Sequence, residues 1–291
     1  MLHTLEHVFV HAIKDNLSLI PFLFITYCIM EAMEHAVSSK TEGAVKYSGK
    51  MGPLFGGILG VIPQCGFSAA AASFYSGGVI TLGTLLAIFL STSDEMLPIL
   101  ISETVPMLTI GKILGLKALV GVAAGFLVDY GLKRIGKGHV VQKHIHDLCE
   151  QEHCHCEEEE SSVWKSALVH TMKVFGFIFL FSALLNLVLE CGGEELLEWL
   201  ADNHSALAAF ITGVVGLVPN CAASVIITQL YLKQLISAGA MMSGLLVSAG
   251  VGVLVLFRTN RSWKQNLKIT GMLYTIGVIA GLLIDLIGMT F

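Results

Sequence analysis

Charged side chains are scarce in this chain: they make up 13% of its 291 residues, against about 25% in an ordinary soluble domain. Hydrophobic residues make up 54%, and apolar runs long enough to cross a hydrocarbon core of ~30 Å recur along the sequence. This composition excludes a soluble globular protein. It predicts an all-α integral membrane protein that crosses the lipid bilayer more than once.

The chain also lacks an excess of positive charge. Its formal net charge is -5, so a nucleic-acid partner has no electrostatic support. It has no Gly-x4-Gly-Lys-Ser/Thr phosphate loop, and we therefore expect an energy source other than nucleotide hydrolysis. Cysteines are few, and three of the seven stand beside histidines in one polar stretch, which is typical of metal ligands and not of a disulfide framework.

A shift of 156 residues aligns the second half of the sequence with the first half without a gap. The matched residues include Pro63 with Pro219, Cys65 with Cys221, Tyr75 with Tyr231, and Asp129 with Asp285. Chance similarity between apolar sequences would not preserve these residue types together. We therefore divide the chain into a first membrane repeat (1–135), a central loop (136–164) and a second membrane repeat (165–291). Asp129 and Asp285 fall near predicted helix ends, where we expect them to be structural anchors.

Lysine and arginine accumulate on the cytoplasmic side of short loops, and their distribution indicates that the two repeats have opposite orientations. Residues 34–49 hold two lysines, whereas the equivalent residues 190–205 hold five acidic residues and no lysine or arginine. Residues 257–268 hold four basic residues, whereas their equivalents 101–112 hold one. This predicts an inverted repeat in the cell membrane, with both termini outside and the central loop in the cytoplasm.

Each repeat is predicted to contain a helix, a hairpin interrupted at its tip, and two further helices. We place these at 16–36, 51–76, 79–100 and 105–132 in the first repeat, and at 166–189, 207–232, 235–256 and 269–289 in the second. Pro63 and Gly66 interrupt the first hairpin, because proline removes a helix hydrogen bond and glycine tolerates the turn. We expect the hairpin to re-enter the membrane, since that preserves the charge pattern; two fully crossing arms are the alternative.

The two hairpin tips carry matching polar side chains, which mark the predicted substrate site. These are Gln64, Cys65 and Ser68 in the first repeat and Asn220, Cys221 and Ser224 in the second. Inverted repeats with discontinuous helices are typical of transporters whose site lies between the repeats. Thiolate suits Zn, Fe, Cu(I) or trivalent arsenic, whereas amide oxygen suits harder ions such as Mn. A proline kink with only a packing role is the competing interpretation.

A second polar segment lies inside the next apolar stretch. It consists of Ser91, Thr92, Ser93, Asp94 and Glu95. A carboxylate at that depth costs ~2.5 kcal/mol or more and normally serves an ion path, a proton relay or a partner. Asp94 is the leading candidate ligand because its counterpart is Gly250, and a single cation needs a single carboxylate. The three hydroxyl groups could instead satisfy a broken-helix backbone, and Glu95 could lie at the outer mouth. Weaker candidates are Ser248, Met241 and Met242, with core packing expected for the methionines.

The central loop concentrates imidazole and thiol side chains, which bind transition metals. These are His139, His144, His146, Cys149, His153, Cys154, His155 and Cys156. A cytoplasmic metal-binding loop would deliver metal from inside, which favours export; a solvated linker is the alternative. His3, His7 and His11 recur every fourth residue and would share one helix face, as a metal site or as part of an amphipathic interfacial helix. Residues 3–7 also spell His-x-x-Glu-His, an inverted zinc-peptidase pattern.

The Pro-Gln-Cys and Pro-Asn-Cys tips, the Ser-Thr-Ser-Asp-Glu segment and the His/Cys-rich loop together resemble a prokaryotic family of ten-segment heavy-metal exporters, labelled arsenic efflux proteins or manganese transporters. The resemblance covers essentially the whole chain and implies efflux of a metal or metalloid ion through the cytoplasmic membrane. The chain is also similar to organoarsenical permeases, although each of its tips has one cysteine where their motif has more than one thiol.

We therefore expect a secondary exporter of a divalent transition metal (Mn, Fe or Zn), driven by protons exchanged at Asp94 or Glu95. The metal ion is the substrate, and neither a bound cofactor nor enzymatic activity is expected. One alternative is an arsenite or organoarsenical permease centred on Cys65 and Cys221. The other is a membrane zinc peptidase that uses residues 3–7. A homodimer is compatible with the sequence.

Overall fold

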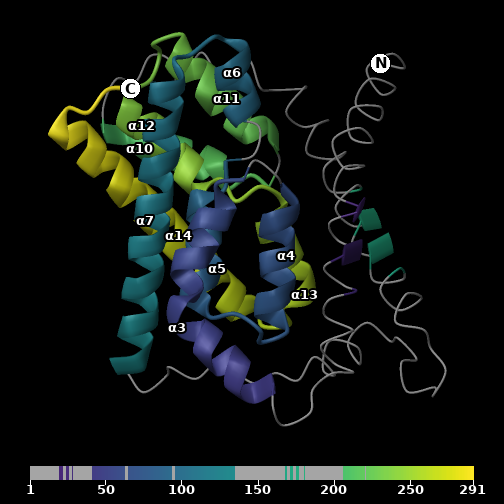
Figure 1. The fold of residues 1–291 in the computed structure, drawn as a ribbon. Helices are drawn as coiled ribbons and strands as arrows, with labels where there is room; N and C mark the ends of the chain where they lie inside the picture. Colours follow the sequence, from purple (N-terminus) through teal and green to yellow (C-terminus); the bar gives the residue numbers. More distant parts are fainter. Residues whose placement is uncertain are drawn as a thin grey trace.

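The computed structural model describes most of both predicted repeats. It covers residues 41–62, 65–93, 96–134, 206–219 and 221–291, together with single residues of two further helices at positions 20, 21, 24, 25, 28, 168, 171, 172, 175, 176 and 180. Every element in these ranges is an α-helix (Figure 1). The described part therefore agrees with the predicted all-α class.

The helices of the first repeat are α3 (Thr41–Gly60), α4 (Cys65–Ser76), α5 (Leu82–Ser91), α6 (Met96–Ser102) and α7 (Met107–Arg134). Those of the second repeat are α10 (Ala206–Gly216), α11 (Cys221–Leu232), α12 (Ala238–Val247), α13 (Val251–Thr259) and α14 (Trp263–Ile287). The interruptions predicted at the hairpin tips are present, because α4 begins at Cys65 and α11 begins at Cys221.

Two details of the predicted helices were wrong. The segments 79–100 and 235–256, expected to be single helices, are each interrupted, so that α5 is followed by α6 and α12 by α13. Apolar residues continue on both sides of each interruption, and the hydropathy pattern alone therefore does not reveal it. Two helices also begin earlier than expected: α3 at Thr41 in place of 51, and α14 at Trp263 in place of 269.

Each repeat is built around one short central helix. α5 packs between α3 and α7, and α12 packs between α10 and α14. Glycines allow the close approach: a Cβ atom on Gly83 would overlap the carbonyl oxygen of Gly125, and one on Gly239 would overlap that of Gly281. These two pairs occupy equivalent positions, so the same packing solution appears in both repeats.

The two repeats also make equivalent hydrogen bonds. Asp129 accepts hydrogen bonds from the Thr81 hydroxyl at 2.7 Å and from the Gly83 amide at 2.9 Å, at the N-terminus of α5. Asp285 accepts equivalent bonds from Ser237 and from the Gly239 amide, both at 2.8 Å, at the N-terminus of α12. A carboxylate at a helix N-terminus accepts hydrogen bonds from unpaired amides, and its negative charge interacts favourably with the helix dipole. The expectation that these aspartates are structural anchors is confirmed.

Helices of the two repeats pack against each other. α4 of the first repeat packs against α13 of the second, and α11 of the second contacts α6 of the first. Figure 1 shows α4 and α13 together in the lower part of the view and α6 and α11 together in the upper part. Because each repeat contributes a helix to its partner's end, the two repeats form one interlocked body.

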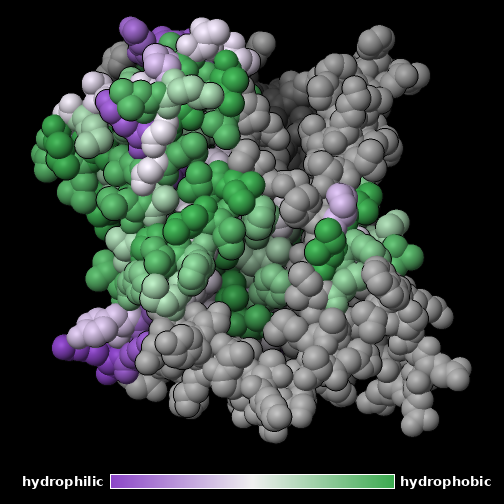
Figure 2. Space-filling model, in the orientation of Figure 1, coloured by the Kyte–Doolittle hydropathy of each residue, from purple (hydrophilic) through white to green (hydrophobic). Residues whose placement is uncertain are grey.

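The surface of this body is apolar where a bilayer would contact it. Large hydrophobic side chains are exposed on α3, α7 and α14, including Phe55 (61%), Leu127 (71%) and Leu283 (50%). Figure 2 shows hydrophobic residues across the middle of the described part and hydrophilic residues towards its two ends. Three segments in the described ranges are long and apolar enough to span a membrane: Met107–Arg134, Ala238–Thr259 and Trp263–Ile287. Together these features are those of a multi-pass membrane protein.

Candidate functional site: two interrupted helices at the repeat interface

Two interrupted helices meet inside the protein. The first interruption begins at Thr92 and separates α5, which ends at Ser91, from α6, which begins at Met96. The second interruption, residues 248–250, separates α12 from α13. They occupy equivalent positions of the repeat, and α5 contacts α12 directly. A helix end leaves carbonyl groups without intrahelical partners, and such groups within a membrane must be paired or must line a water-filled cavity. The span that contains the second interruption is 94% buried in the protein, so lipid does not surround it.

A lysine from α7 bridges the two interruptions. The Lys117 ammonium donates hydrogen bonds to the carbonyl oxygen of Thr92, just past the end of α5, and to that of Leu245, in the last turn of α12, at 2.6 Å for the latter. Its side chain is 1% exposed. Among the described residues it is the one charged side chain that is fully buried. A positive charge therefore lies where the broken helices of both repeats come together.

The hydroxyl groups of the first interruption bond to backbone carbonyls. Ser91 Oγ and Thr92 Oγ1 donate to carbonyls one turn earlier in α5, at 2.8 Å and 2.7 Å. Ser93 Oγ donates to the carbonyl of Val61 at 2.5 Å and so ties the interruption to the end of α3. These bonds agree with the interpretation that the hydroxyls satisfy a broken backbone. The oxygen atoms keep their lone pairs for a ligand.

The second interruption contains a buried polar group without a partner. Gly250 has a φ of 53°, in the region that favours glycine, and this residue turns the chain between α12 and α13. Ser248, the counterpart of Thr92, is 3% exposed, and its hydroxyl makes no hydrogen bond. Most buried hydroxyl groups in proteins have a partner, so an exception calls for an explanation such as an ion or a water molecule.

The helices that follow the hairpin tips reach the interrupted helix of the opposite repeat. α4, which begins at Cys65, packs against α13 so closely that a Cβ atom on Gly252 would lie 2.7 Å from Cβ of Ser68. In the second repeat α11, which begins at Cys221, contacts α6 less extensively. Ser68 and Ser224 are both buried in these helices. The structure thus brings the first turn of α4 to the start of α13, and α11 into contact with α6.

Several predicted ligands lie outside the described residues. They are Gln64, Asn220, Asp94 and Glu95 near the interruptions, His3, His7 and His11, and the loop residues His139, His144, His146, Cys149, His153, Cys154, His155 and Cys156. For Cys65 and Cys221 the structure describes the backbone but not the side chain. In the ranges that are described, no three His, Cys, Asp or Glu side chains come together. The donors that the structure does place at the interruptions are carbonyl and hydroxyl oxygens.

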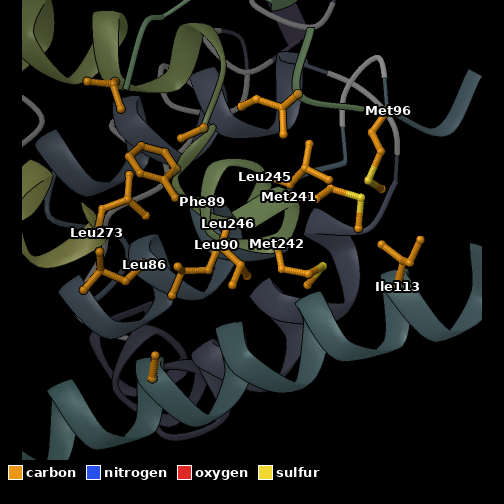
Figure 3. Packing of buried hydrophobic residues seen from close by; sticks show 14 of the residues in the cluster. Leu86, Phe89, Leu90, Met96, Ile113, Met241, Met242, Leu245, Leu246 and Leu273 are labelled. Atoms are coloured by element: carbon orange, nitrogen blue, oxygen red, sulfur yellow. The ribbon is translucent and has the colours of Figure 1, made fainter. Parts of the chain in front are cut away.

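The two candidate methionines belong to the core. Met241 and Met242 are 0% exposed and are part of the main hydrophobic cluster. Figure 3 shows them with Leu90 from α5 and Ile113 from α7. The expectation of core packing is confirmed.

Sequence reasoning missed Lys117. The residue stands within the apolar sequence of α7, and its counterpart in the second repeat is Leu273. A signal was present, because an ionisable residue inside a membrane segment marks a functional site by default. Applying to this lysine the rule that singled out Asp94 would have found it.

Comparison with known proteins gives one family. A family described as "Putative, 10TM heavy-metal exporter" matches residues 4–196, about two thirds of the chain. The comparisons with curated proteins and with solved structures found no match. The matched range spans the first repeat, the central loop and the start of the second repeat. The rest of the second repeat lies outside the match, but its sequence aligns with the first repeat. With helices fit to span a membrane and interrupted in both repeats, the chain belongs to this family of heavy-metal exporters.

Proposed function

We propose that this protein is a secondary active exporter of a divalent transition-metal ion, Mn, Fe or Zn, across the cytoplasmic membrane, driven by protons moving the other way. One observation carries the proposal: the interrupted helices of the two repeats meet at a buried polar centre, bridged by Lys117. A soluble enzyme does not need such a centre inside an apolar body. A transporter does, because a hydrated ion must exchange water for protein ligands midway across the membrane.

The arrangement of the helices supports an inverted repeat with re-entrant tips. In Figure 1, α7 runs from the top of the view to the bottom, whereas its counterpart α14 runs from the bottom to the top. The pairs α4 with α13 and α6 with α11 lie at opposite ends of the body. An antiparallel relation places the two tips opposite each other, so that alternating access needs only a rocking movement of one repeat against the other.

We propose as substrate ligands the polar residues that lie next to the interruptions in the sequence. Asp94, which follows Ser93 in the sequence, supplies the single carboxylate. The tip residues Gln64, Cys65, Asn220 and Cys221, with Ser68 and Ser224 one turn later, supply amide, thiol and hydroxyl groups. Carboxylate and amide oxygens suit Mn, whereas the thiols suit Zn and Fe. The histidines and cysteines of the central loop collect metal on the cytoplasmic side.

The decisive experiment is transport by the full-length protein in reconstituted vesicles, with a panel of metals and an imposed proton gradient. We expect gradient-dependent movement of at least one of Mn, Fe and Zn. Asp94→Asn should lower that transport at least about tenfold, since loss of a charged ligand costs about 1.4 kcal/mol or more. Glu103→Gln, at an exposed turn before α7, is the matched control and should leave transport unchanged. If no metal moves with or without a gradient, the proposal is wrong.

An arsenite or organoarsenical permease is the second candidate, favoured by one observation. Cys65 and Cys221 each begin a helix that contacts the other repeat, and they have equivalent positions in the sequence repeat. Metal-tolerance assays in an export-deficient host separate the two candidates. Replacing both cysteines by serine should abolish arsenical resistance if this candidate is correct, whereas Asp94→Asn should selectively reduce resistance to divalent metals if the first is correct.

The orientation can be tested with single cysteines placed at Lys46 and Glu195 in a variant whose native cysteines are replaced. A membrane-impermeant thiol reagent applied to intact cells should modify the cysteine at position 195 and spare the one at position 46. Modification of both from the same side would rule out the inverted arrangement.

A further inference from the structure

The ammonium group of Lys117 lies among acceptors that suit a free cation. Both of its described acceptors are carbonyl oxygens at C-terminal helix ends, Thr92 after α5 and Leu245 in the last turn of α12. The C-terminal end of a helix carries a partial negative charge and stabilises cations. Carbonyl oxygens at such ends also coordinate metal ions in transporters built from discontinuous helices.

The lysine has no equivalent in the second repeat. Its counterpart is Leu273, which is 0% exposed and belongs to the hydrophobic core. One ammonium group therefore serves the helix ends of both repeats, as expected for a position that holds one positive charge. A purely structural strut would be expected twice, as the Asp129 and Asp285 anchors are.

A third oxygen donor follows Leu245 at the end of α12 and has no hydrogen-bond partner. Ser248 is the C-cap residue of α12, three residues after Leu245, and its buried hydroxyl has no hydrogen-bond partner. Its counterpart Thr92 donates to a carbonyl one turn earlier at 2.7 Å, so of these two equivalent hydroxyl groups only that of Ser248 lacks a partner. A hydroxyl oxygen that neither donates nor accepts is available as a ligand for a cation.

We propose that Lys117 is a tethered cation that occupies the position of the transported metal ion. The metal binds the carbonyl oxygens of Thr92 and Leu245 and the hydroxyl of Ser248 only after it has displaced the ammonium group. Two positive charges cannot share these oxygens, because their repulsion is strong away from bulk water. When no metal is bound, the ammonium keeps the two repeats linked. A set of oxygen donors selects a harder divalent ion, so the substrate class is that of Mn²⁺.

This inference rests on the proposed function but can be tested without transport. The measurement is Mn²⁺ binding to the purified full-length protein in detergent, with free Mn²⁺ quantified by electron paramagnetic resonance. Lys117→Met keeps the length of the side chain and removes its charge. Lys112→Met is the matched control, since Lys112 is an exposed lysine of the same helix. The central loop is identical in both variants, so a difference in their Mn²⁺ affinity arises from a site at the interrupted helices.

We expect Lys117→Met to bind Mn²⁺ at least about tenfold more tightly than Lys112→Met, because a competing charge has been removed. Ser248→Ala, which breaks no hydrogen bond, should weaken binding about threefold or more. Equal dissociation constants for the two lysine variants overturn the proposal, and so does wild-type binding by Ser248→Ala. If Lys117→Met does not fold, Ser248→Ala alone decides. Failure of the proposed exporter function is a different result, namely absence of metal transport by wild-type protein in vesicles.

Discussion

Replacing Asp129 or Asp285 by alanine tests the anchors that position α5 and α12, and with them the interruptions that follow these helices. Each carboxylate holds a hydroxyl group and a glycine amide at a helix N-terminus. The two sites have the same residues at the amide position and near-equal distances. The same substitution should therefore have the same effect in both repeats, which offers an internal control.

The size of the effect follows from the bonds that are lost. The buried amide of Gly83 or Gly239 loses its acceptor, which costs about 1–3 kcal/mol. The negative charge at the helix N-terminus is lost as well, for about 0.3–1 kcal/mol. Thr81 keeps a partner in the hydroxyl of Thr84 at 2.8 Å, so its bond adds little. We expect a loss of about 2–3 kcal/mol for either alanine variant, and about half of that for asparagine, which retains one acceptor oxygen.

Unfolding of the purified protein in detergent with increasing SDS measures the free energy, and Mn²⁺ transport in vesicles measures function. Asp129→Ala and Asp285→Ala should agree within about 0.5 kcal/mol, and their effects should add in the double variant because the sites share no partner. The metal concentration for half-maximal transport should stay at the wild-type value. Wild-type stability combined with weakened metal transport would refute the reasoning, because the aspartates would then be ligands and not anchors.

Two further predictions concern packing and the first interruption. Gly239→Ala places a Cβ atom on the carbonyl oxygen of Gly281 and should destabilise the protein by about 2–3 kcal/mol. The control Gly115→Ala meets open space and should leave the stability unchanged or raise it slightly. Thermal melting in detergent compares the two variants. Ser93→Ala removes the hydrogen bond to Val61 and should lower the stability by about 1 kcal/mol. It should also lower the maximal transport rate, while the metal concentration for half-maximal transport stays unchanged. A large rise in that concentration would instead identify Ser93 as a ligand.

The sequence predicted the interruptions at the hairpin tips, raised a broken helix at Ser91, Thr92 and Ser93 only as an alternative, and missed the interruption that follows α12. Pro63 and Pro219 act locally, since each removes a helix hydrogen bond wherever it stands. The second pair of interruptions has no such marker in common: the first depends on hydroxyl groups that bond to backbone, and the second on Gly250 with its positive φ. Neither feature shows in a hydropathy pattern, because serine and glycine are ordinary inside membrane helices.

In the candidate site, too, the sequence predicted one charged residue and missed another. Asp94 could be singled out from the cost of a charge inside an apolar stretch, and its place in the site remains a prediction. Lys117 carries the same kind of signal, but its meaning depends on what it contacts. Its acceptors are 25 and 128 residues away along the chain. No local rule connects positions so far apart.

By itself, the sequence determined that the protein lies in a membrane and predicted two copies of one unit, because hydropathy and the spacing of proline, cysteine and aspartate are properties of the chain read in order. Only the tertiary structure decided that α4 packs against α13 and α11 against α6, and that one lysine joins the broken helices of both repeats. The physical reason is that such contacts depend on the complementary shapes of helices and on the need of the backbone groups at a helix end for a partner. Both conditions are met only when distant parts of the chain come together.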